Sequence, residues 1–294
     1  MNFNKFLPLL MIIAMFLWAS SFVSAKVLAL YINEHELVTY RYLITTLTMV
    51  PVLWALKIPF KIDIMSFIIA IISAIFLVAY TKLFFLGTDA STANFSGALI
   101  TTLMPIIVYV ILVFSGEKRP KTKDWLALLI GIVGVSIMIN IWQFKFDEVL
   151  NAATLLLVWA AFSFALLSIS TSYNEKVNPL SFSFYIYLVA TLLNSIFFFD
   201  IVNGSILVMD KYFWFNMMLM SVGSTTFATT IYFFGMQKLG AKATVYTFLV
   251  PFFVILLGVI FLGESIHIST VIGSTITIIA LLVINNVKLS DFRL

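Results

Sequence analysis

The sequence predicts an all-α membrane protein: ten transmembrane helices arranged as two inverted five-helix repeats, with the N- and C-termini both cytoplasmic. Three observations predict this fold. First, 62% of the 294 residues are apolar and 10% are charged, whereas soluble domains are about half apolar and a quarter charged. Second, the apolar residues form ten segments of about 20 residues, the length that crosses a bilayer. Third, the second half of the chain repeats features of the first.

The mean hydropathy of +1.11 excludes a water-soluble protein. A chain of this size keeps a large surface, and that surface would be mostly apolar. We therefore expect a lipid bilayer as the solvent of the protein. The alternation of a transmembrane strand barrel is absent, and helices are the remaining way to satisfy backbone groups in lipid.

The first apolar stretch runs from Leu7 past Leu30, which is longer than the core of a signal peptide and has no cleavage signature after it. It predicts a retained first helix. Nine more apolar segments follow, each bounded by charges, Pro, Gly or Asn. The ten predicted spans cover residues 7–30, 37–56, 64–87, 91–114, 124–142, 151–172, 180–199, 213–236, 242–262 and 267–287.

Lys and Arg predict the orientation, because cytoplasmic loops carry an excess of them. With a cytoplasmic N-terminus, three basic residues face outside: Lys26, Lys145 and Lys211. Twelve face the cytoplasm: Lys5, Lys57, Lys61, Lys118, Arg119, Lys121, Lys123, Lys176, Lys238, Lys242, Lys288 and Arg293. This bias predicts that both termini are cytoplasmic. The other two basic residues, Arg41 and Lys82, fall inside predicted helices.

An internal repeat divides the chain into residues 1–145 and 146–294. Four features recur: Trp18-Ala19 at Trp159-Ala160, Leu83–Gly87 at Ile231–Gly235, Met104-Pro105 at Val250-Pro251, and Gly116-Glu117 at Gly263-Glu264. The offset is 141 residues for the first and 148, 146 and 147 for the others. Because each half has five helices, an odd number, the halves must insert with opposite orientation. Such inverted repeats are typical of secondary transporters, whose substrate site lies between the halves.

These elements resemble the EamA family of the drug/metabolite transporter superfamily over roughly residues 8–287. The resemblance lies in the opening Trp-Ala-Ser-Ser-Phe motif (Trp18 to Phe22), the arginine of Tyr40-Arg41-Tyr42, and the paired elements in which a proline precedes Gly-Glu. The resemblance implies a ten-helix carrier in the bacterial inner membrane. It also implies that the substrate is a small molecule, commonly an exported amino acid or related metabolite.

Other classes of function lack the residues they need. Without cysteine, and with histidine only at His35 and His267, the chain offers no predicted metal site. Motifs for nucleotide, zinc and serine-hydrolase chemistry are absent, so we expect no cofactor and no enzymatic activity. The basic residues are topology signals, so we expect no nucleic-acid partner. A membrane-embedded enzyme and an assembly protein stay as alternatives, and the small-residue helix faces fit a monomer or a homodimer.

Arg41 and Lys82 are the two charges predicted inside helices, where a charge usually faces a cavity or a partner. Arg41 could bind a substrate carboxylate or phosphate, or instead pair with Glu34 or Glu36 or extend to the headgroups. Lys82 could supply a second cation to the same site. Reaching the headgroups or pairing with Asp89 is the favoured interpretation for Lys82.

Aromatic side chains that recur in the two halves are candidate cavity walls. The duplication favours Trp18 and Trp159 for this role, although most aromatic residues of such a chain pack against lipid or the core. The same reasoning adds Tyr80, Tyr232 and Tyr246. All five are predicted substrate-binding residues.

Pro105 and Pro251 interrupt the fourth and ninth predicted helices at equivalent places. Each frees a backbone carbonyl and could act as a hinge for alternating access, or could hold a fixed kink. Asn94 lies in the same helix as Pro105 and is a predicted substrate contact. Thr225 lies on a polar stripe of the eighth helix with Ser221 and Thr229, which fits either close helix packing or substrate contact.

No acidic residue falls in the middle of a predicted span. A carrier that exchanges a cationic drug for protons needs a buried carboxylate that titrates. The sequence therefore disfavours a multidrug cation antiporter and predicts an uncharged, zwitterionic or anionic substrate. Glu117 and Glu264 are interpreted as structural carboxylates near helix ends.

Overall fold

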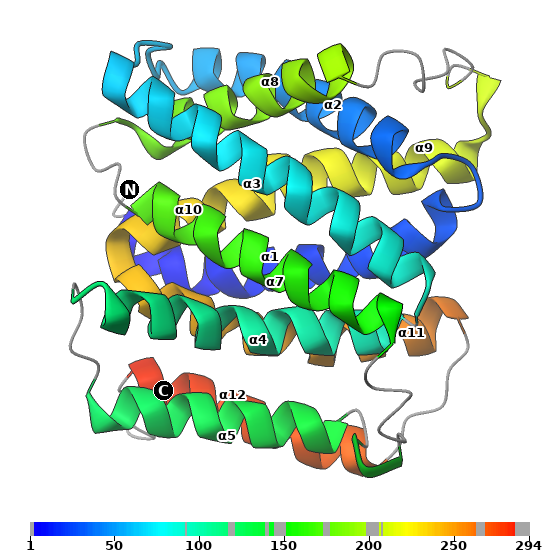
Figure 1. Cartoon of the computed structure of the whole chain (residues 1–294), viewed down its shortest axis with the longest axis vertical. Helices are drawn as coiled ribbons and strands as arrows, with labels where there is room; N and C mark the ends of the chain where they lie inside the picture. The colour runs from blue at the N-terminus through cyan, green and yellow to red at the C-terminus, as the bar shows by residue number, and fades with distance from the viewer. Residues whose placement is uncertain are drawn as a thin grey trace.

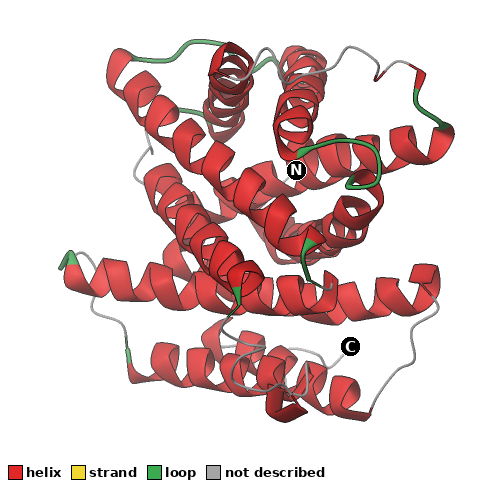
Figure 2. Cartoon of the chain, turned by 45° about the vertical axis from the view of Figure 1, so that its right-hand side comes forward, coloured by secondary structure: helices red, strands yellow, loops and turns green. Residues whose placement is uncertain are grey.

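The computed structural model describes residues 3–91, 93–116, 121–138, 141–143, 151–172, 177–197, 206, 208–262 and 268–285, and these residues are helical with short connections and no strand (Figure 2). The helical elements of the first half are α1 (Phe3–Leu28), α2 (Glu34–Ala55), α3 (Ile64–Asp89), α4 (Ala93–Phe114), α5 (Thr122–Met138) and the short η1 (Ile141–Gln143). Those of the second half are α7 (Ala152–Ser172), α8 (Pro179–Phe197), α9 (Lys211–Met218), η4 (Leu219–Thr229), α10 (Thr230–Leu239), η5 (Gly240–Phe248), α11 (Leu249–Leu262) and α12 (Ile268–Asn285).

Eight segments of the described chain are long and apolar enough to cross a membrane. They are Phe6–Leu28, Glu34–Ala55, Ile64–Asp89, Ala93–Phe114, Ala152–Thr171, Pro179–Phe197, Lys211–Leu239 and Lys242–Phe261. The segments that correspond to the fifth and tenth predicted spans, α5 and α12, are helical but are not among these eight. The protein is thus an all-helical, multi-pass membrane protein, and the count of ten spans stays a prediction.

Helix packing relates the two halves by an approximate two-fold symmetry. α3 packs against α7 as α1 packs against η4, and α4 packs against α7 as α1 packs against α11. The pairs α2–α8, α4–α11 and α5–α12 join each helix to its own counterpart. α5 and α12 form a separate layer beyond α4 and α11 (Figure 1). α1 begins and α12 ends at the same end of the bundle (Figure 1), as an even number of helical passes requires.

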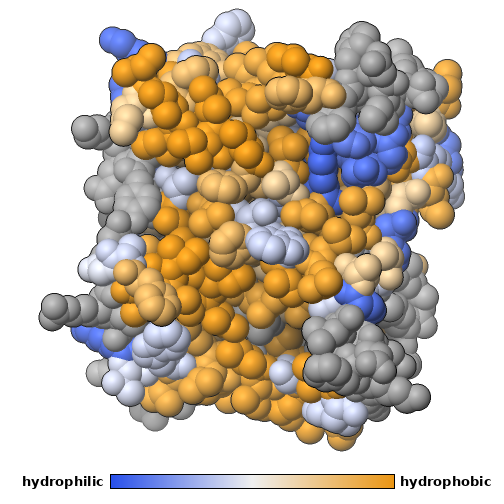
Figure 3. Space-filling view, in the orientation of Figure 1, coloured by the Kyte–Doolittle hydropathy of each residue, from blue (hydrophilic) through white to orange (hydrophobic). Residues whose placement is uncertain are grey.

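The outer surface matches a bilayer environment. Large apolar side chains such as Leu47, Phe114 and Phe215 are exposed on the helices. On the face seen in Figure 3 the middle of the helices is covered by apolar residues, and hydrophilic patches lie at the two ends. Because the helix axes run from one side of this view to the other, the apolar region forms a belt across them, as hydrocarbon requires.

The third helix of the second half departs from regular α-helix, a feature that the apolar pattern of the sequence does not predict. Residues 219–229 form a π-helical segment, η4, in which threonine hydroxyls donate to carbonyls five residues earlier. Thr225 donates to the carbonyl of Met220 at 2.8 Å and Thr229 to that of Ser224 at 2.9 Å. Residues 240–248 then form a 3₁₀ segment, η5, before α11 begins. π-Helical turns are rare in proteins, and those that occur are often found at functional sites.

Side-chain caps fix where the helices that carry the candidate site begin. The Asn33 side chain accepts hydrogen bonds from the backbone N–H groups of His35 and Glu36, and the Glu36 side chain accepts one from the backbone of Asn33 at 3.1 Å. This capping box satisfies N–H groups that otherwise lack partners at the start of α2. It places Arg41 about two turns into the helix.

Asp63 and Asp210 cap the N-termini of α3 and α9, and both have a lowered pKa. The Asp63 carboxylate accepts hydrogen bonds from the hydroxyl and backbone N–H of Ser66, which lower its pKa. For Asp210, the backbone N–H of Phe213 and then the Tyr31 hydroxyl lower the pKa. A lowered folded-state pKa means that each carboxylate stabilises the fold above its unfolded-state pKa of about 3.9 and loses this contribution as pH falls through the folded-state value.

We therefore expect the thermal stability of the purified protein to fall as pH drops below about 4, and the double variant Asp63→Asn, Asp210→Asn to lose less stability over that range. Asparagine is also a good N-cap, so the variant and the parent should be similar at pH 7. Melting temperatures in detergent from pH 7 to pH 3 measure the difference. Parallel curves for the two proteins would contradict the role of these caps.

Several predictions fall on residues outside the described part of the chain. These are Glu117, Gly263, Glu264 and His267, and the boundary between residues 145 and 146. The basic residues Lys118, Arg119, Lys145, Lys176, Lys288 and Arg293, which helped to set the predicted orientation, are also outside it.

Candidate functional site

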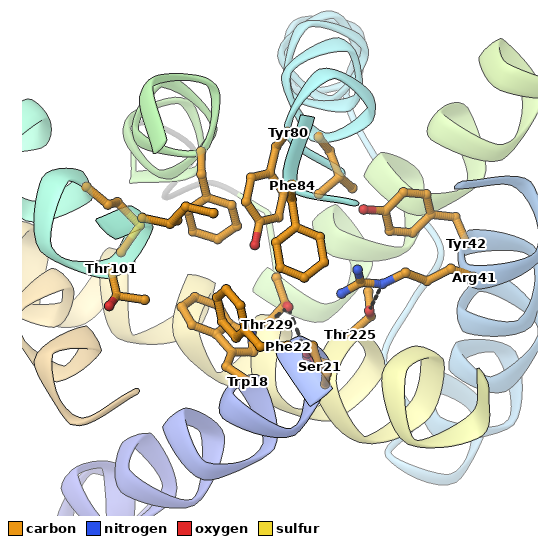
Figure 4. Close-up of a pocket in the computed structure, with 15 residues that line it drawn as sticks. Trp18, Ser21, Phe22, Arg41, Tyr42, Tyr80, Phe84, Thr101, Thr225 and Thr229 are labelled. Atoms are coloured by element: carbon orange, nitrogen blue, oxygen red, sulfur yellow. Dashed lines mark hydrogen bonds between the residues drawn. The ribbon is translucent and has the colours of Figure 1, made fainter. Parts of the chain in front are cut away.

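A small cavity of about 30 Å³ lies among the helices, about halfway along them (Figure 4). Its walls come from α1, α2, α3 and α4 of the first half and from α7 and η4 of the second. The lining residues are Trp18, Ser21, Phe22, Arg41, Tyr42, Leu77, Tyr80, Phe84, Ile100, Thr101, Met104, Phe164, Ser224, Thr225 and Thr229. This volume holds a few water molecules at most, whereas pockets for metabolites measure roughly 300–1,000 Å³. A ligand of metabolite size would therefore need the walls of this cavity to lie further apart than they do in this structure.

Arg41 is the single charged residue among these lining residues. It is 5% exposed, and its Nε donates a hydrogen bond to Thr225 Oγ1 at 2.7 Å. Its Nη1 is buried without a hydrogen-bond partner. Within the described residues Arg41 forms no ion pair, so the expected alternatives of Glu34 and Glu36 are not its partners here. In Figure 4 the guanidinium points into the cavity.

The hydroxyl groups of η4 are arranged to accept hydrogen bonds from the first half. The Thr225 and Thr229 hydroxyls use their protons on carbonyls of η4 itself, as described above, which leaves their lone pairs for Arg41 and for Trp18. Trp18 Nε1 donates to Thr229 Oγ1 at 3.0 Å. Ser21 and Ser224 share a hydrogen bond at 2.6 Å. The π-helical segment thus supplies the polar contacts that join the two halves at the cavity.

Aromatic rings form the rest of the wall and pack edge to face. The Trp18 ring lies 5.3 Å from that of Phe164 at an interplanar angle of 88°, and Tyr80 lies 4.6 Å from Phe164 at 61°. Phe22 and Phe84 meet at 5.1 Å and 77°. Such pairs add about 0.5–1.5 kcal/mol beyond the burial of their area. The wall is therefore largely apolar and closely packed.

Four of the nine predicted substrate-binding residues line this cavity, namely Trp18, Arg41, Tyr80 and Thr225. Tyr232 lies directly behind it, with its ring centroid 4.7 Å from that of Trp18 and its hydroxyl bonded to Ser168. Tyr246, in η5, is buried away from the cavity. Asn94 lies at the start of α4 and is not among the lining residues.

Lys82 and Trp159 are not brought to the cavity. Lys82 lies on α3 where it interacts electrostatically with Glu34 and His35 at the start of α2. Lys26 Nζ donates a hydrogen bond to the backbone carbonyl of Asp89 at 2.7 Å, and the pairing of Lys82 with Asp89 stays a prediction. Trp159 is 58% exposed on α7, where its ring meets Phe162. The expectation that the Trp18 and Trp159 rings wall one cavity is therefore not met in this structure.

The position of Trp159 outside the cavity can be explained by the offset that was used to pair it with Trp18. The pairing of Trp18 with Trp159 used an offset of 141 residues, whereas the proline pair uses 146. Applied to Trp18, an offset of 146 gives Phe164, which does line the cavity and packs against Trp18. The two rings that face each other across the halves are thus a tryptophan and a phenylalanine, which a search for identical residues misses.

The predicted hinges differ in their surroundings. Pro105 lies inside α4, where it cannot donate to the carbonyl of Thr101 four residues earlier. Thr247 Oγ1 of η5 is 2.9 Å from that carbonyl and donates to it, sharing its proton with the carbonyl of Thr244 at 2.6 Å. Pro251 lies in the first turn of α11, where a missing N–H costs little. The carbonyl that Pro105 leaves without its helical partner therefore accepts a hydrogen bond from the opposite half of the chain.

Sequence reasoning missed several lining residues, among them Ser21, Tyr42, Thr101 and Phe164. A signal for Ser21 was present, because it lies within the Trp18 to Phe22 motif that carried the family resemblance. For the described residues, no group of His, Cys, Asp and Glu is placed to bind a metal ion.

The hydrogen bond of Trp18 gives a direct test of the cavity wall. Trp18→Phe keeps an aromatic ring but removes the donor to Thr229, and we expect transport to fall about fivefold, which corresponds to about 1 kcal/mol for one hydrogen bond. Trp159→Phe alters a ring outside the cavity and should have no comparable effect. Initial rates of flux into proteoliposomes measure both. Equal losses in the two variants would contradict the assignment of the cavity.

Comparison with known proteins places the chain in a transporter family. The family model of the EamA-like transporter family matches residues 5–140 and residues 151–286, so it covers both halves. No curated protein matches the chain. One protein of known crystal structure is similar over 99% of both chains, with a TM-score of 0.77 and 15% sequence identity, which shows a shared fold.

Proposed function

We propose that this chain, which belongs to the EamA-like transporter family, is a secondary transporter that exports an amino acid or a related small polar metabolite across the bacterial inner membrane. Its two halves, residues 1–145 and 146–294, would rock against each other around the cavity. Both termini would lie in the cytoplasm. The proposal follows the family for the class of activity and the charge distribution for the orientation.

The single observation that carries the proposal is the buried, partly unpaired Arg41 in a cavity between the halves. A charged side chain at a helix centre is costly, about 3 kcal/mol on scales from insertion experiments. A guanidinium that has no counter-ion among the described residues is suited to bind an anionic partner. The cavity is too small for a metabolite in this state, so binding requires the walls to separate, as alternating access does.

The substrate-binding residues in this proposal are Trp18, Arg41, Tyr80 and Thr225, which line the cavity, with Tyr232 supporting Trp18 from behind. Pro105 and Pro251 would serve as hinges. Support for the first hinge comes from the Thr247 hydroxyl on the freed Thr101 carbonyl, because that contact must change when the halves move apart.

Counterflow into proteoliposomes tests the proposal. Purified protein is reconstituted into vesicles preloaded with a panel of unlabelled amino acids and organic anions, and entry of the labelled compound is followed. We expect saturable, protein-dependent exchange for at least one class. Absence of saturable flux for every class, with the protein shown to be folded by size-exclusion chromatography, would refute the proposal.

A further inference from the structure

We propose that the site selects a lone carboxylate, so that the preferred substrate is a small organic monoanion with a flat apolar body and without a free ammonium group. This inference rests on the proposed transport function and names the substrate class of the same cavity. It differs from that proposal by separating the two charges that an amino acid carries.

Among the lining residues, the buried side-chain polar atom without a hydrogen-bond partner is Arg41 Nη1, a donor that fits an anion. The Thr225 and Thr229 hydroxyls have committed their protons to carbonyls of η4, so they accept hydrogen bonds and do not donate to a ligand. Trp18 Nε1 is committed to Thr229. Arg41 Nη1 has no partner and points into the cavity (Figure 4). A planar guanidinium matches the geometry of a carboxylate, which can accept two parallel hydrogen bonds.

An ammonium group finds no matching charge at the same place. None of the lining residues is Asp or Glu. In an α-amino acid the ammonium lies one carbon away from the carboxylate, so a carboxylate seated on Arg41 brings the ammonium close to the guanidinium. Like charges at that separation repel, and a poorly hydrated cavity screens them weakly. An ammonium would also lose its water without gaining a charged acceptor.

The aromatic walls favour an apolar body over a cation. Ring faces can bind a cation when they are open. Here Phe164 packs edge to face with both Trp18 and Tyr80, and Phe22 packs in the same way on Phe84. These contacts use part of the ring surface, and the Tyr42 ring already has a cation near it, because Arg41 Cζ lies 5.7 Å from its centroid. What the wall offers to a ligand is apolar surface, which suits a flat hydrocarbon group next to the carboxylate.

Three probes of one skeleton separate the charges: 3-phenylpropionate carries the carboxylate, phenethylamine carries the ammonium, and phenylalanine carries both. Binding to the full-length protein in detergent is measured by isothermal titration calorimetry, which avoids passive leak through vesicles. We expect 3-phenylpropionate to bind at least tenfold more tightly than phenylalanine, and phenethylamine to bind most weakly. Arg41→Gln should weaken 3-phenylpropionate at least tenfold and leave phenethylamine within twofold.

Two further variants serve as controls. Lys211→Gln removes an exposed cation at the first residue of α9, outside the cavity, and should leave the order of the three affinities unchanged. Arg41→Lys keeps the positive charge but lacks the planar guanidinium, and it serves as the control if Arg41→Gln does not fold. We expect Arg41→Lys to keep the preference for the anion with a reduced affinity. This inference would be overturned if phenylalanine bound as tightly as 3-phenylpropionate or more tightly. Saturable exchange in proteoliposomes would in that case still support the transport function. Failure of all three probes to bind would overturn it as well, and absence of exchange for every class would refute the transport function itself.

Discussion

Replacing Arg41 by glutamine is expected to reduce the transport of carboxylate substrates by roughly 10- to 100-fold. The side chain would lose a charge-assisted hydrogen bond to the substrate, worth about 1.5–3 kcal/mol. The glutamine amide could still bond to Thr225, which accepts a hydrogen bond from Arg41 Nε in the parent protein. The fold should therefore survive, because the substitution also removes the cost of a buried charge without a counter-ion.

The measurement is the concentration dependence of initial flux in proteoliposomes for the parent protein and for Arg41→Gln. A rise in KM with little change in the maximal rate would indicate that Arg41 binds the substrate in its ground state. Thr225→Val is the companion variant, because it removes the acceptor of Arg41 Nε and keeps the charge. We expect it to have a smaller effect. Unchanged flux in Arg41→Gln would remove this residue from the site.

Substituting Gly131 by alanine is expected to have the largest effect on stability, about 1–3 kcal/mol. Gly131 lies on α5, and a Cβ atom at this position would overlap the ring of Phe248 at the end of η5. Phe248 is fully buried, so the ring has little room to give. α5 would have to move away from η5, and the contact between the α5–α12 layer and the rest of the protein would loosen.

Thermal unfolding in detergent compares the parent, Gly131→Ala, Phe248→Leu and the double variant. Because the smaller side chain leaves space for the new methyl group, the double variant should be more stable than the sum of the two single effects predicts. Gly223→Ala is a control in another helix, where a Cβ meets only the side chains of Leu219 and Leu17 at 3.3 and 3.5 Å. Simple additivity of Gly131→Ala and Phe248→Leu would contradict the steric explanation.

The sequence was sufficient to predict the helical membrane architecture and the two repeats, because hydrophobic length and repeated motifs are properties of single segments. The described helices begin and end within a few residues of the predicted spans. The π-helical segment η4 could not be predicted, because its register depends on threonine hydroxyls that bond back to their own helix and receive Arg41 and Trp18 from the other half. Such contacts exist only once the halves have packed.

For the candidate site, the sequence singled out Arg41, which lines the cavity, since a charge in an apolar helix stands out without any knowledge of its neighbours. It could not separate Trp18 from Trp159, because which face of a helix is buried depends on the neighbouring helices. Nor could it identify the apolar lining residue Phe164, which resembles many other phenylalanines of a chain that contains 30 of them. The sequence could predict which helix a residue belongs to, but it could not predict which residues of that helix line the cavity.

The unequal distribution of polar groups between the repeats bears on the resting orientation of a carrier. Two identical inverted halves would make the inward-open and outward-open forms equal in free energy, and an empty protein would populate both equally. Here the guanidinium belongs to one half and the π-helical acceptors belong to the other. The two open forms therefore expose different groups to water and differ in free energy. For a carrier of the kind proposed above, we therefore expect the empty protein to favour one of the two open forms.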